Sequence, residues 1–524
     1  MLEKQWQIIH KFIFSCKSNI CFLRVPDGLL TEELKNDFCV IDAAKDFSPY
    51  KPFLGILESL KANFADDKSD LTDLSYSVQR NSFISYFLTG IADERYDIPL
   101  ANELLYEQNR FIKTIICLLE KYSYKNYLIL NAQCLSSESV AVIRALENSE
   151  VKGKFAFCYS AFKNDMEPSA AFNLLDEYSS KPNYLYLVSD ILTIAKDRTQ
   201  YKIILDMPEE IQFGMIYKTL RNNRIFMCLN QLKEAAQWVS ENFMKFDYKD
   251  NQKRELSLEL AKCLFDCNLV DESILYLNDL IDEQDEDEFT STAYYYLARA
   301  FSAKKAISLI NKYCALAKKC YEKDENNKYR ALNAMLDFYY SKTTNSEDMV
   351  AKYQEALRLL EMQGYTNNYI SLSVSVPWKL MNDVNARAAI DEGIDKCLSL
   401  ADKIDNQHLV STACHWKGII CSHYGEINEA LEWYDKCNEI RTKIGEIGPL
   451  LNIRNGLCYD SMCRAVYKRA YDLENGIVEN LYNISDFSTV TDTLKNLSYA
   501  LFYSRHFSEA YEVFNLISKF LQIF

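Results

Sequence analysis

Apolar and polar positions recur with a period of about 40 residues in the C-terminal part of the chain, residues 408–524. Ala430, Ala470 and Ala510 are evenly spaced at this interval. A large side chain or its near equivalent follows each alanine four residues later: Tyr434, Glu474 and Phe514. A small residue followed one turn later by a large one is typical of the place where two antiparallel helices cross closely. The pattern therefore predicts repeated helix pairs.

Two windows, 415–437 and 493–517, share a wider pattern of an apolar helix, a short turn and a second amphipathic helix. The middle window, 452–475, fits the same pattern only after a shift of two residues. One helix pair cannot bury its own apolar face, so a fixed period of this length indicates an α-solenoid in which neighbouring pairs cover each other.

Small residues also occur on the first helix of these pairs. Gly418 and Ser498 supply them, and Gly425 ends the first helix in the first window. These residues resemble the tetratricopeptide repeat in its longer form. Residues 255–281 again read as helix, turn and helix, with Ala261 and Ser273 as the small crossing residues. We therefore expect a tetratricopeptide-like solenoid over residues 231–524.

Residues 1–165 show a different pattern, in which short apolar runs alternate with amphipathic stretches. We expect strands at 19–25, 38–43, 126–132 and 154–161, and helices at 1–18, 48–60, 104–122 and 136–149. Buried strands that alternate with helices predict an α/β domain with a parallel sheet covered on both faces. Residues 166–230 are punctuated by prolines and are expected to form a helical lid or connecting segment.

Four segments of this region occur in the order seen in the nucleotide-binding domain of STAND-type signal-transduction ATPases, which carry C-terminal helical repeats. "SPYKPFLGILESL" (48–60) resembles their Pro-x-x-Pro helix entry, and "NYLILNAQCLSSESVAVIRAL" (126–146) resembles the strand and helix around their metal-binding acidic pair. "KFAFCYSAF" (154–162) resembles the sensor strand, and "KPNYLYLVSDIL" (181–192) resembles the lid helix. The resemblance implies a P-loop NTPase-like fold over residues 1–165. An unrelated α/β domain is the alternative.

The residues that hydrolyse nucleotide in that class are replaced in this chain. A phosphate loop needs Gly-x-x-x-x-Gly-Lys-Ser/Thr. With the hydroxyl placed at Thr31, Arg24 and Leu29 stand where the glycines belong, and Leu30 stands where the lysine belongs. The later strand ends in Asn131 and Ala132 in place of paired carboxylates. We therefore expect a degenerate domain without nucleoside-triphosphate hydrolysis, cofactor or catalytic residue.

Composition narrows the choice of partners. The net charge of −15 repels phosphate backbones and disfavours nucleic-acid binding. The 17 cysteines are odd in number, form no Cys-x-x-Cys pair and lie largely within apolar helical patterns, which predicts free thiols in a reducing cytoplasm. No apolar run reaches about 18 residues, so no membrane span is expected. Cys414, His415, Cys421 and His423 lie on two helix faces, and no metal site is expected.

A partner is expected in the groove of the solenoid, because the first helix of each pair lines the concave face of such a stack. Aromatic side chains with a few polar neighbours suit a peptide or a partner helix. The expected contact residues are Thr412, His415, Ile419 and Ser422 in one unit, and Asp492, Lys495, Tyr499 and Tyr503 in another.

These observations predict a non-enzymatic, regulatory interaction protein, in which a pseudo-NTPase domain precedes a repeat superhelix that binds a protein or peptide. One alternative is a transcription regulator of the repeat-bearing ATPase class without its DNA-binding tail. Another is an inactive subunit that supports a catalytic partner or pairs with a second copy of itself. ATP turnover that disappears on mutation of Thr31 would contradict the non-enzymatic prediction, and a specific shift of DNA would favour the transcription regulator.

Overall fold

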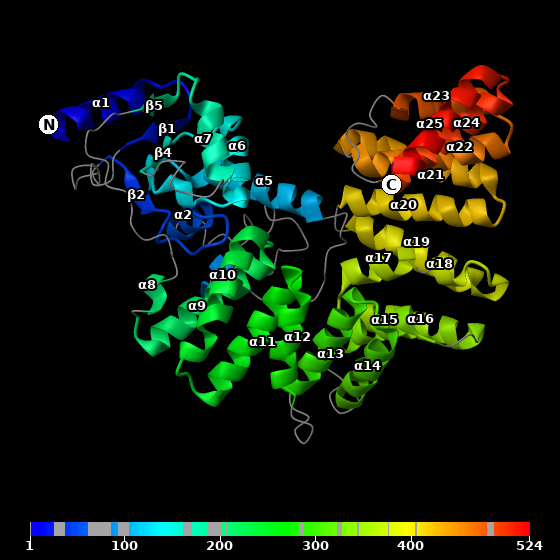
Figure 1. Ribbon diagram of the computed structural model, residues 1–524, viewed down its shortest axis with the longest axis horizontal. Coiled ribbons are helices and arrows are strands. Elements are labelled where there is room, and N and C mark those ends of the chain that lie inside the picture. Colours follow the sequence, from blue (N-terminus) through cyan, green and yellow to red (C-terminus); the bar gives the residue numbers. More distant parts are fainter. Residues whose placement is uncertain are drawn as a thin grey trace. The chain divides into compact units, whose positions relative to one another are not determined.

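The computed structural model describes residues 2–25, 37–60, 85–87, 89–92, 104–160, 170–186, 202–205, 207–281, 288–321, 327–342, 345–375, 377–403, 406–445, 447–478 and 487–523. The chain forms two compact units (Figure 1). Unit 1 comprises residues 1–96 and 104–325, and unit 2 comprises residues 97–103 and 326–524. The predicted boundaries at 165 and 230 both lie inside unit 1 and stay predictions.

Unit 1 begins with the expected parallel sheet. Its strands lie in the order β2-β3-β4-β1-β5, and every pairing is parallel. The strands are β1 (Ile20–Arg24), β2 (Cys39–Asp42), β3 (Tyr127–Leu130), β4 (Phe155–Tyr159) and β5 (Tyr184–Tyr186). The helices of this part are α1 (Leu2–Ser15), α2 (Phe53–Leu60), α5 (Leu104–Tyr122), α6 (Ser137–Glu147) and α7 (Ala170–Tyr178).

The two faces of the sheet are covered by different helices, because side chains alternate along each strand. Cys21 and Leu23 of β1 pack with Ile9 and Ile13 of α1 on one face. Phe22, together with the odd-numbered residues of β3 and β4, packs with α2, α5, α6 and α7 on the other face. The α/β domain with helices on both faces of a parallel sheet is confirmed.

One part of the sequence interpretation is wrong. Residues 181–192 resemble a lid helix in sequence, but Tyr184–Tyr186 form the edge strand β5, which pairs with β1. Residues 187–192 lie outside the described residues. The amide of Phe22 donates to the carbonyl of Asn183 at 2.9 Å, and the side-chain amide of Asn183 donates to the carbonyl of Ile20 at 3.1 Å. The free edge of β1 thus provides hydrogen bonds that a local helix pattern does not reveal.

The rest of unit 1 is helical and begins the solenoid. Its helices are α8 (Lys202–Leu205), α9 (Glu209–Ile225), α10 (Leu229–Asn242), α11 (Asp250–Asp266), α12 (Val270–Asp279), α13 (Glu288–Ala303) and α14 (Ile307–Tyr321). The predicted crossing of Ala261 and Ser273 is present, because the buried Ser273 hydroxyl donates to the Ala261 carbonyl at 2.8 Å. A buried ion pair between Arg224 and Glu259, at 2.7 Å, joins α9 to α11.

Unit 2 continues the helical repeats, whose helices follow one another in Figure 1. They are α15 (Arg330–Tyr340), α16 (Ser346–Met362), α17 (Thr366–Ser375), α18 (Pro377–Leu380), α19 (Arg387–Lys403), α20 (Gln407–His423), α21 (Ile427–Ile444), α22 (Ile447–Cys463), α23 (Tyr467–Val478), α24 (Phe487–Tyr503) and α25 (Phe507–Ile523). In the last three helix pairs, the first helices begin at residues 407, 447 and 487, and the second helices begin at residues 427, 467 and 507. The middle pair, α22 and α23, therefore needs no two-residue shift, and that expectation is wrong.

The small residues act as the sequence predicts. Ala430, Ala470 and Ala510 are buried in the second helices. The ring of Tyr434 lies against two glycines: a Cβ added at Gly418 would come within 2.8 Å of this ring, and one at Gly456 within 3.0 Å. Gly418 belongs to the same helix pair as Tyr434 and Gly456 to the next one, so a single aromatic ring joins successive pairs. The tetratricopeptide-like solenoid is confirmed.

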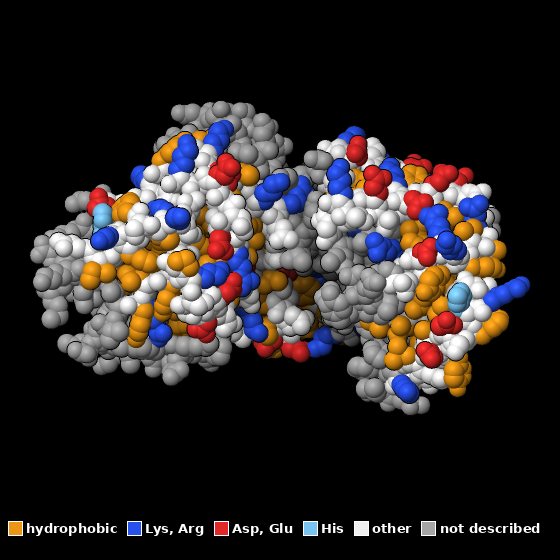
Figure 2. Space-filling view, turned by 90° about the horizontal axis from the view of Figure 1, so that it is seen from above, with side chains coloured by type: hydrophobic (Ala, Val, Ile, Leu, Met, Phe, Trp, Pro, Cys, Tyr) orange, Lys and Arg blue, Asp and Glu red, His pale blue; other side chains and the backbone are white. Residues whose placement is uncertain are grey.

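Charged side chains are mixed with hydrophobic ones over the surfaces seen in Figure 2. Among the helices that the structure describes, none combines the length and the apolar character needed to cross a membrane.

Candidate functional site

The carboxyl ends of β2, β3 and β4 meet at one edge of the sheet, here called the sheet edge. In parallel α/β sheets this edge is the usual place for a ligand. Asn131, the residue after β3, donates its side-chain amide to Asp42 Oδ1 at 2.7 Å and accepts the Ser160 hydroxyl at 2.9 Å. The amide of Gln133 donates to Asn131 Oδ1 at 3.2 Å and to Ser160 Oγ at 3.0 Å.

This sheet edge is a closed polar network. The backbone amide of Ser160 donates to Gln133 Oε1 at 3.2 Å, and Asp42 Oδ1 also accepts the backbone amide of Ala44 at 3.0 Å. Asn131 holds a left-handed backbone, with φ of 53°, a conformation that asparagine adopts more readily than most residues. The side chains therefore bind one another.

The expected degenerate positions fall partly on this edge. Asn131 lies within the network, and Ala132 is buried and has no side-chain oxygen. Arg24, at the end of β1, places its guanidinium 5.4 Å from the centre of the Tyr186 ring. Leu29, Leu30 and Thr31 lie outside the described residues.

Unit 2 offers a second candidate on its first helices, α20, α22 and α24. The four residues predicted on α24 reach the surface: Asp492, Lys495, Tyr499 and Tyr503 are all exposed. Tyr499 is 38% exposed and Tyr503 is 52% exposed. The ring of Tyr503 also stacks on Tyr467, with ring centres 5.4 Å apart.

The residues predicted on α20 lie deeper. Thr412 is buried, and its hydroxyl accepts the Arg441 guanidinium at 2.6 Å, so it does not reach the surface. Ser422 is half-buried and donates to Asp460 Oδ1 of the next first helix at 2.7 Å. His415 and Ile419 are half-buried. The four predicted residues of α24 are thus exposed together. Thr412 and Ser422 of α20 instead bind side chains of neighbouring helices.

Buried polar groups between α20 and α21 explain this depth. Arg441 Nη1 lies 2.8 Å from His408 Nδ1, and an arginine can only donate, so His408 Nδ1 accepts and carries no proton. Burial, with a smaller contribution from the Arg441 charge, lowers the pKa of His415 to about 4. Both histidines are therefore neutral near pH 7.

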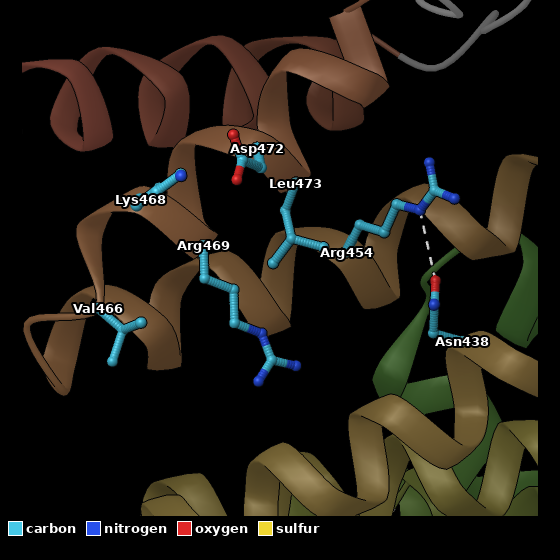
Figure 3. Close-up of a pocket in the computed structure, with 7 residues that line it drawn as sticks. All are labelled: Asn438, Arg454, Val466, Lys468, Arg469, Asp472 and Leu473. Carbon is cyan, nitrogen blue, oxygen red and sulfur yellow. Dashed lines mark hydrogen bonds between the residues drawn. The ribbon is translucent and has the colours of Figure 1, made fainter.

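Two features were missed in the sequence. Tyr459 of α22 is 56% exposed and lies 40 residues before Tyr499, so the repeat interval itself would have revealed it. The other is a pocket of about 580 Å³ on unit 2, drawn in Figure 3. Its lining consists of Asn438, Arg454, Val466, Lys468, Arg469, Asp472 and Leu473.

One group of possible metal ligands occurs within the described residues. Atoms of Cys421, Glu426 and Glu429 lie within 4.8 Å of one another. Burial raises the pKa of Cys421 to about 11, which keeps the sulfur protonated near pH 7, whereas metals bind the thiolate. This group does not by itself indicate a metal site.

No family model matches the chain, and no curated protein matches its sequence. Among solved structures, a STAND protein with a tetratricopeptide-repeat sensor from Pyrococcus horikoshii matches with a TM-score of 0.50 at 11% identity, over 98% of this chain and 94% of that one. The apo form of RapI matches with a TM-score of 0.48 at 12% identity, over 60% of this chain and 86% of that one. A Rap protein complexed with competence and sporulation factor matches with a TM-score of 0.38 at 10% identity, over 60% and 98%.

These likenesses concern the fold. The match to the STAND protein extends over nearly the whole of both chains and includes the sheet as well as the repeats. The chain therefore has the architecture of an α/β domain similar to that of a signal-transduction ATPase, followed by a tetratricopeptide-like solenoid.

Proposed function

We propose that this protein is a non-enzymatic scaffold whose solenoid binds a protein or peptide partner on the exposed side chains of α20, α22 and α24. The observation that carries this proposal is a column of equivalent residues, Ile419, Tyr459 and Tyr499, spaced at the repeat interval along the three first helices. Tyr459 and Tyr499 are exposed, and Ile419 is half-buried. We call this column, together with the next one, the first-helix face.

The second column consists of His423, Cys463 and Tyr503, all of which are exposed. Rigid aromatic side chains with polar neighbours are the groups that most often anchor a protein partner. Asp492 and Lys495 lie on the same helix as Tyr499 and supply charge beside the aromatic rings.

The aromatic residues of the first-helix face are exposed in more than one helix pair, and not only in the last described pair. Phe514 is 39% exposed, but its equivalent Tyr434 is only 3% exposed because α22 of the next pair covers it. Among the described residues, no further helix pair packs on α25. The exposure of Phe514 therefore reflects its place in the last described pair. By contrast, Tyr459 is exposed although α24 packs beside its helix.

The α/β domain is proposed to be a pseudo-NTPase that supports the solenoid. Asn131 and Ala132 replace the carboxylates that would hold a metal ion, and the Asn131 side chain is already bonded to Asp42 and Ser160. Loss of a cation and of metal ligands near a developing phosphate charge removes several kcal/mol of transition-state stabilisation.

The partner proposal is tested with the full chain carrying Tyr459→Ser and Tyr499→Ser together. The matched control is Tyr511→Ser, which removes a 67% exposed tyrosine from α25 and leaves the first-helix face intact. Proteins captured from lysate are quantified by mass spectrometry, and one that binds the wild type and the control is purified for titration. We expect its dissociation constant to rise at least tenfold in the double variant only. Equal binding by the double variant would contradict the proposal.

The pseudo-NTPase proposal is tested separately by phosphate release from ATP with magnesium. We expect no turnover above that of the buffer. ATP turnover that disappears in Thr31→Ala would contradict it.

A further inference from the structure

The pocket of unit 2 lies among α21, α22 and α23 and differs in charge from the chain as a whole. Its lining carries the three cations Arg454, Lys468 and Arg469 and the single carboxylate of Asp472. The lining charge is therefore +2 (3 − 1), in a protein whose net charge is −15. Figure 3 shows that Arg454, on α22, directs its guanidinium toward Asn438, and that Arg469, on α23, extends on the other side of Leu473.

Arg454 occupies a position that the repeat normally fills with a core residue. Its equivalents, Cys414 and Leu494, are 0% and 5% exposed. Arg454 is half-buried instead, and its Nε donates to Asn438 Oδ1 at 3.4 Å. A guanidinium at a core position costs stability unless it has a compensating interaction. In the described part of the chain, no carboxylate forms an ion pair with it.

The neighbouring helix pairs also lack cations at the positions of the other two lining residues, Lys468 and Arg469. At the position of Lys468 the neighbouring pairs have Asn428 and Ser508, and at that of Arg469 they have Glu429 and Glu509. Lys468 is exposed and has no ion-pair partner among the described residues. Arg469 uses Nη2 to contact Asp435 Oδ1 at 2.5 Å, which leaves its Nε and Nη1 hydrogens for another acceptor. Three independent departures from the repeat thus place cations in the lining of one pocket.

We propose that this pocket binds a phosphate-bearing ligand. A phosphate monoester carries a charge of about −1.5 to −2 near pH 7, opposite in sign to the excess charge of the lining. Guanidinium groups donate paired hydrogen bonds to phosphate oxygens, and lysine adds a point charge. The cavity of about 580 Å³ is far larger than one phosphate group and within the range of small-molecule sites, so it has room for the group that carries the phosphate.

The test uses the full chain in phosphate-free buffer at constant ionic strength, because salt alone screens exposed charges. Inorganic phosphate, pyrophosphate and citrate are titrated by calorimetry, and thermal unfolding is followed in parallel. The variants Arg454→Leu and Lys468→Ser each install a residue that a neighbouring pair holds at the same position. These substitutions should preserve the fold, and thermal unfolding of each variant without ligand checks this.

We expect saturable binding of phosphate or pyrophosphate, with a dissociation constant at least tenfold higher in Arg454→Leu and in Lys468→Ser. Lys436→Gln is the matched control, because it removes an exposed cation of α21 outside the lining and should change the constant less than twofold. Absence of saturable binding to the wild type, unchanged binding by the pocket variants, or binding of citrate alone would each overturn the proposal.

Discussion

The sheet edge and the first-helix face use polar residues in opposite ways. At the sheet edge, Asn131, Gln133 and Ser160 bind one another and Asp42, so these side chains are occupied. On the first-helix face, Tyr459 and Tyr499 project from a packed helix into solvent. In the first region the polar side chains bind one another, whereas in the second they are exposed at regular intervals.

This difference indicates where binding should be sought. A closed network contributes to stability, so substitutions there should change the free energy of unfolding more than they change the binding of a partner. Exposed residues contribute little to stability, so changes there should alter binding with almost no effect on unfolding. The predictions below separate these two kinds of residue.

The largest effect is expected at Asn131. Asn131→Ala removes three side-chain hydrogen bonds and places alanine in the left-handed conformation, which together should lower the free energy of unfolding by about 3 kcal/mol. Ser160→Ala, which removes one hydroxyl from the same network, is the graded control and should cost about 1 kcal/mol. Denaturant unfolding of the full chain measures both. Loss of less than 0.5 kcal/mol in Asn131→Ala would show that the network is not closed.

A packed position of the solenoid should give a smaller loss. Gly418→Val adds atoms where even a Cβ would lie 2.8 Å from the Tyr434 ring, and we expect about 2 kcal/mol of destabilisation. Adding Tyr434→Ala to this variant removes the clash, so the second change should cost less than it does in the wild type. Tyr459→Ala, exposed on the neighbouring first helix, should change unfolding by less than 0.5 kcal/mol. Strictly additive losses in the double variant would contradict the contact.

The sequence predicted the regular parts of the fold because apolar periodicity reports burial. The repeat interval located the two helix pairs whose helices begin at 407 and 427 and at 487 and 507, and it indicated Gly418 as a close-packing residue. The exposed Tyr499 and Tyr503 followed from the same helical phase. These features depend on local spacing, which a sequence displays directly.

The features that were missed depend on contacts between distant residues. β5 is only three residues long and exists because the edge of β1 pairs with it. Thr412 was expected on the surface, but Arg441 of the next helix bonds its hydroxyl and fixes it in the core. The pocket is lined by Arg454 of α22 together with residues of α23. Its positive charge is recognised only when equivalent positions of several repeats are compared.

The smallest predicted effect distinguishes a half-buried histidine of α20 from an exposed one by its response to pH. The folded pKa of His415, about 4, lies below its unfolded value of about 6.5, so the unfolded chain binds the proton more tightly and stability falls as the pH drops between these values. We expect this histidine to cost about 1 kcal/mol at pH 5.5 and almost nothing at pH 7.5. The difference in unfolding free energy between the wild type and His415→Gln, measured at both pH values, isolates this contribution from other titrating groups. His423→Gln, at an exposed position of the same helix, is the comparison variant and is measured at the same two pH values. The same pH response in both variants would mean that His415 is as accessible as the first-helix face.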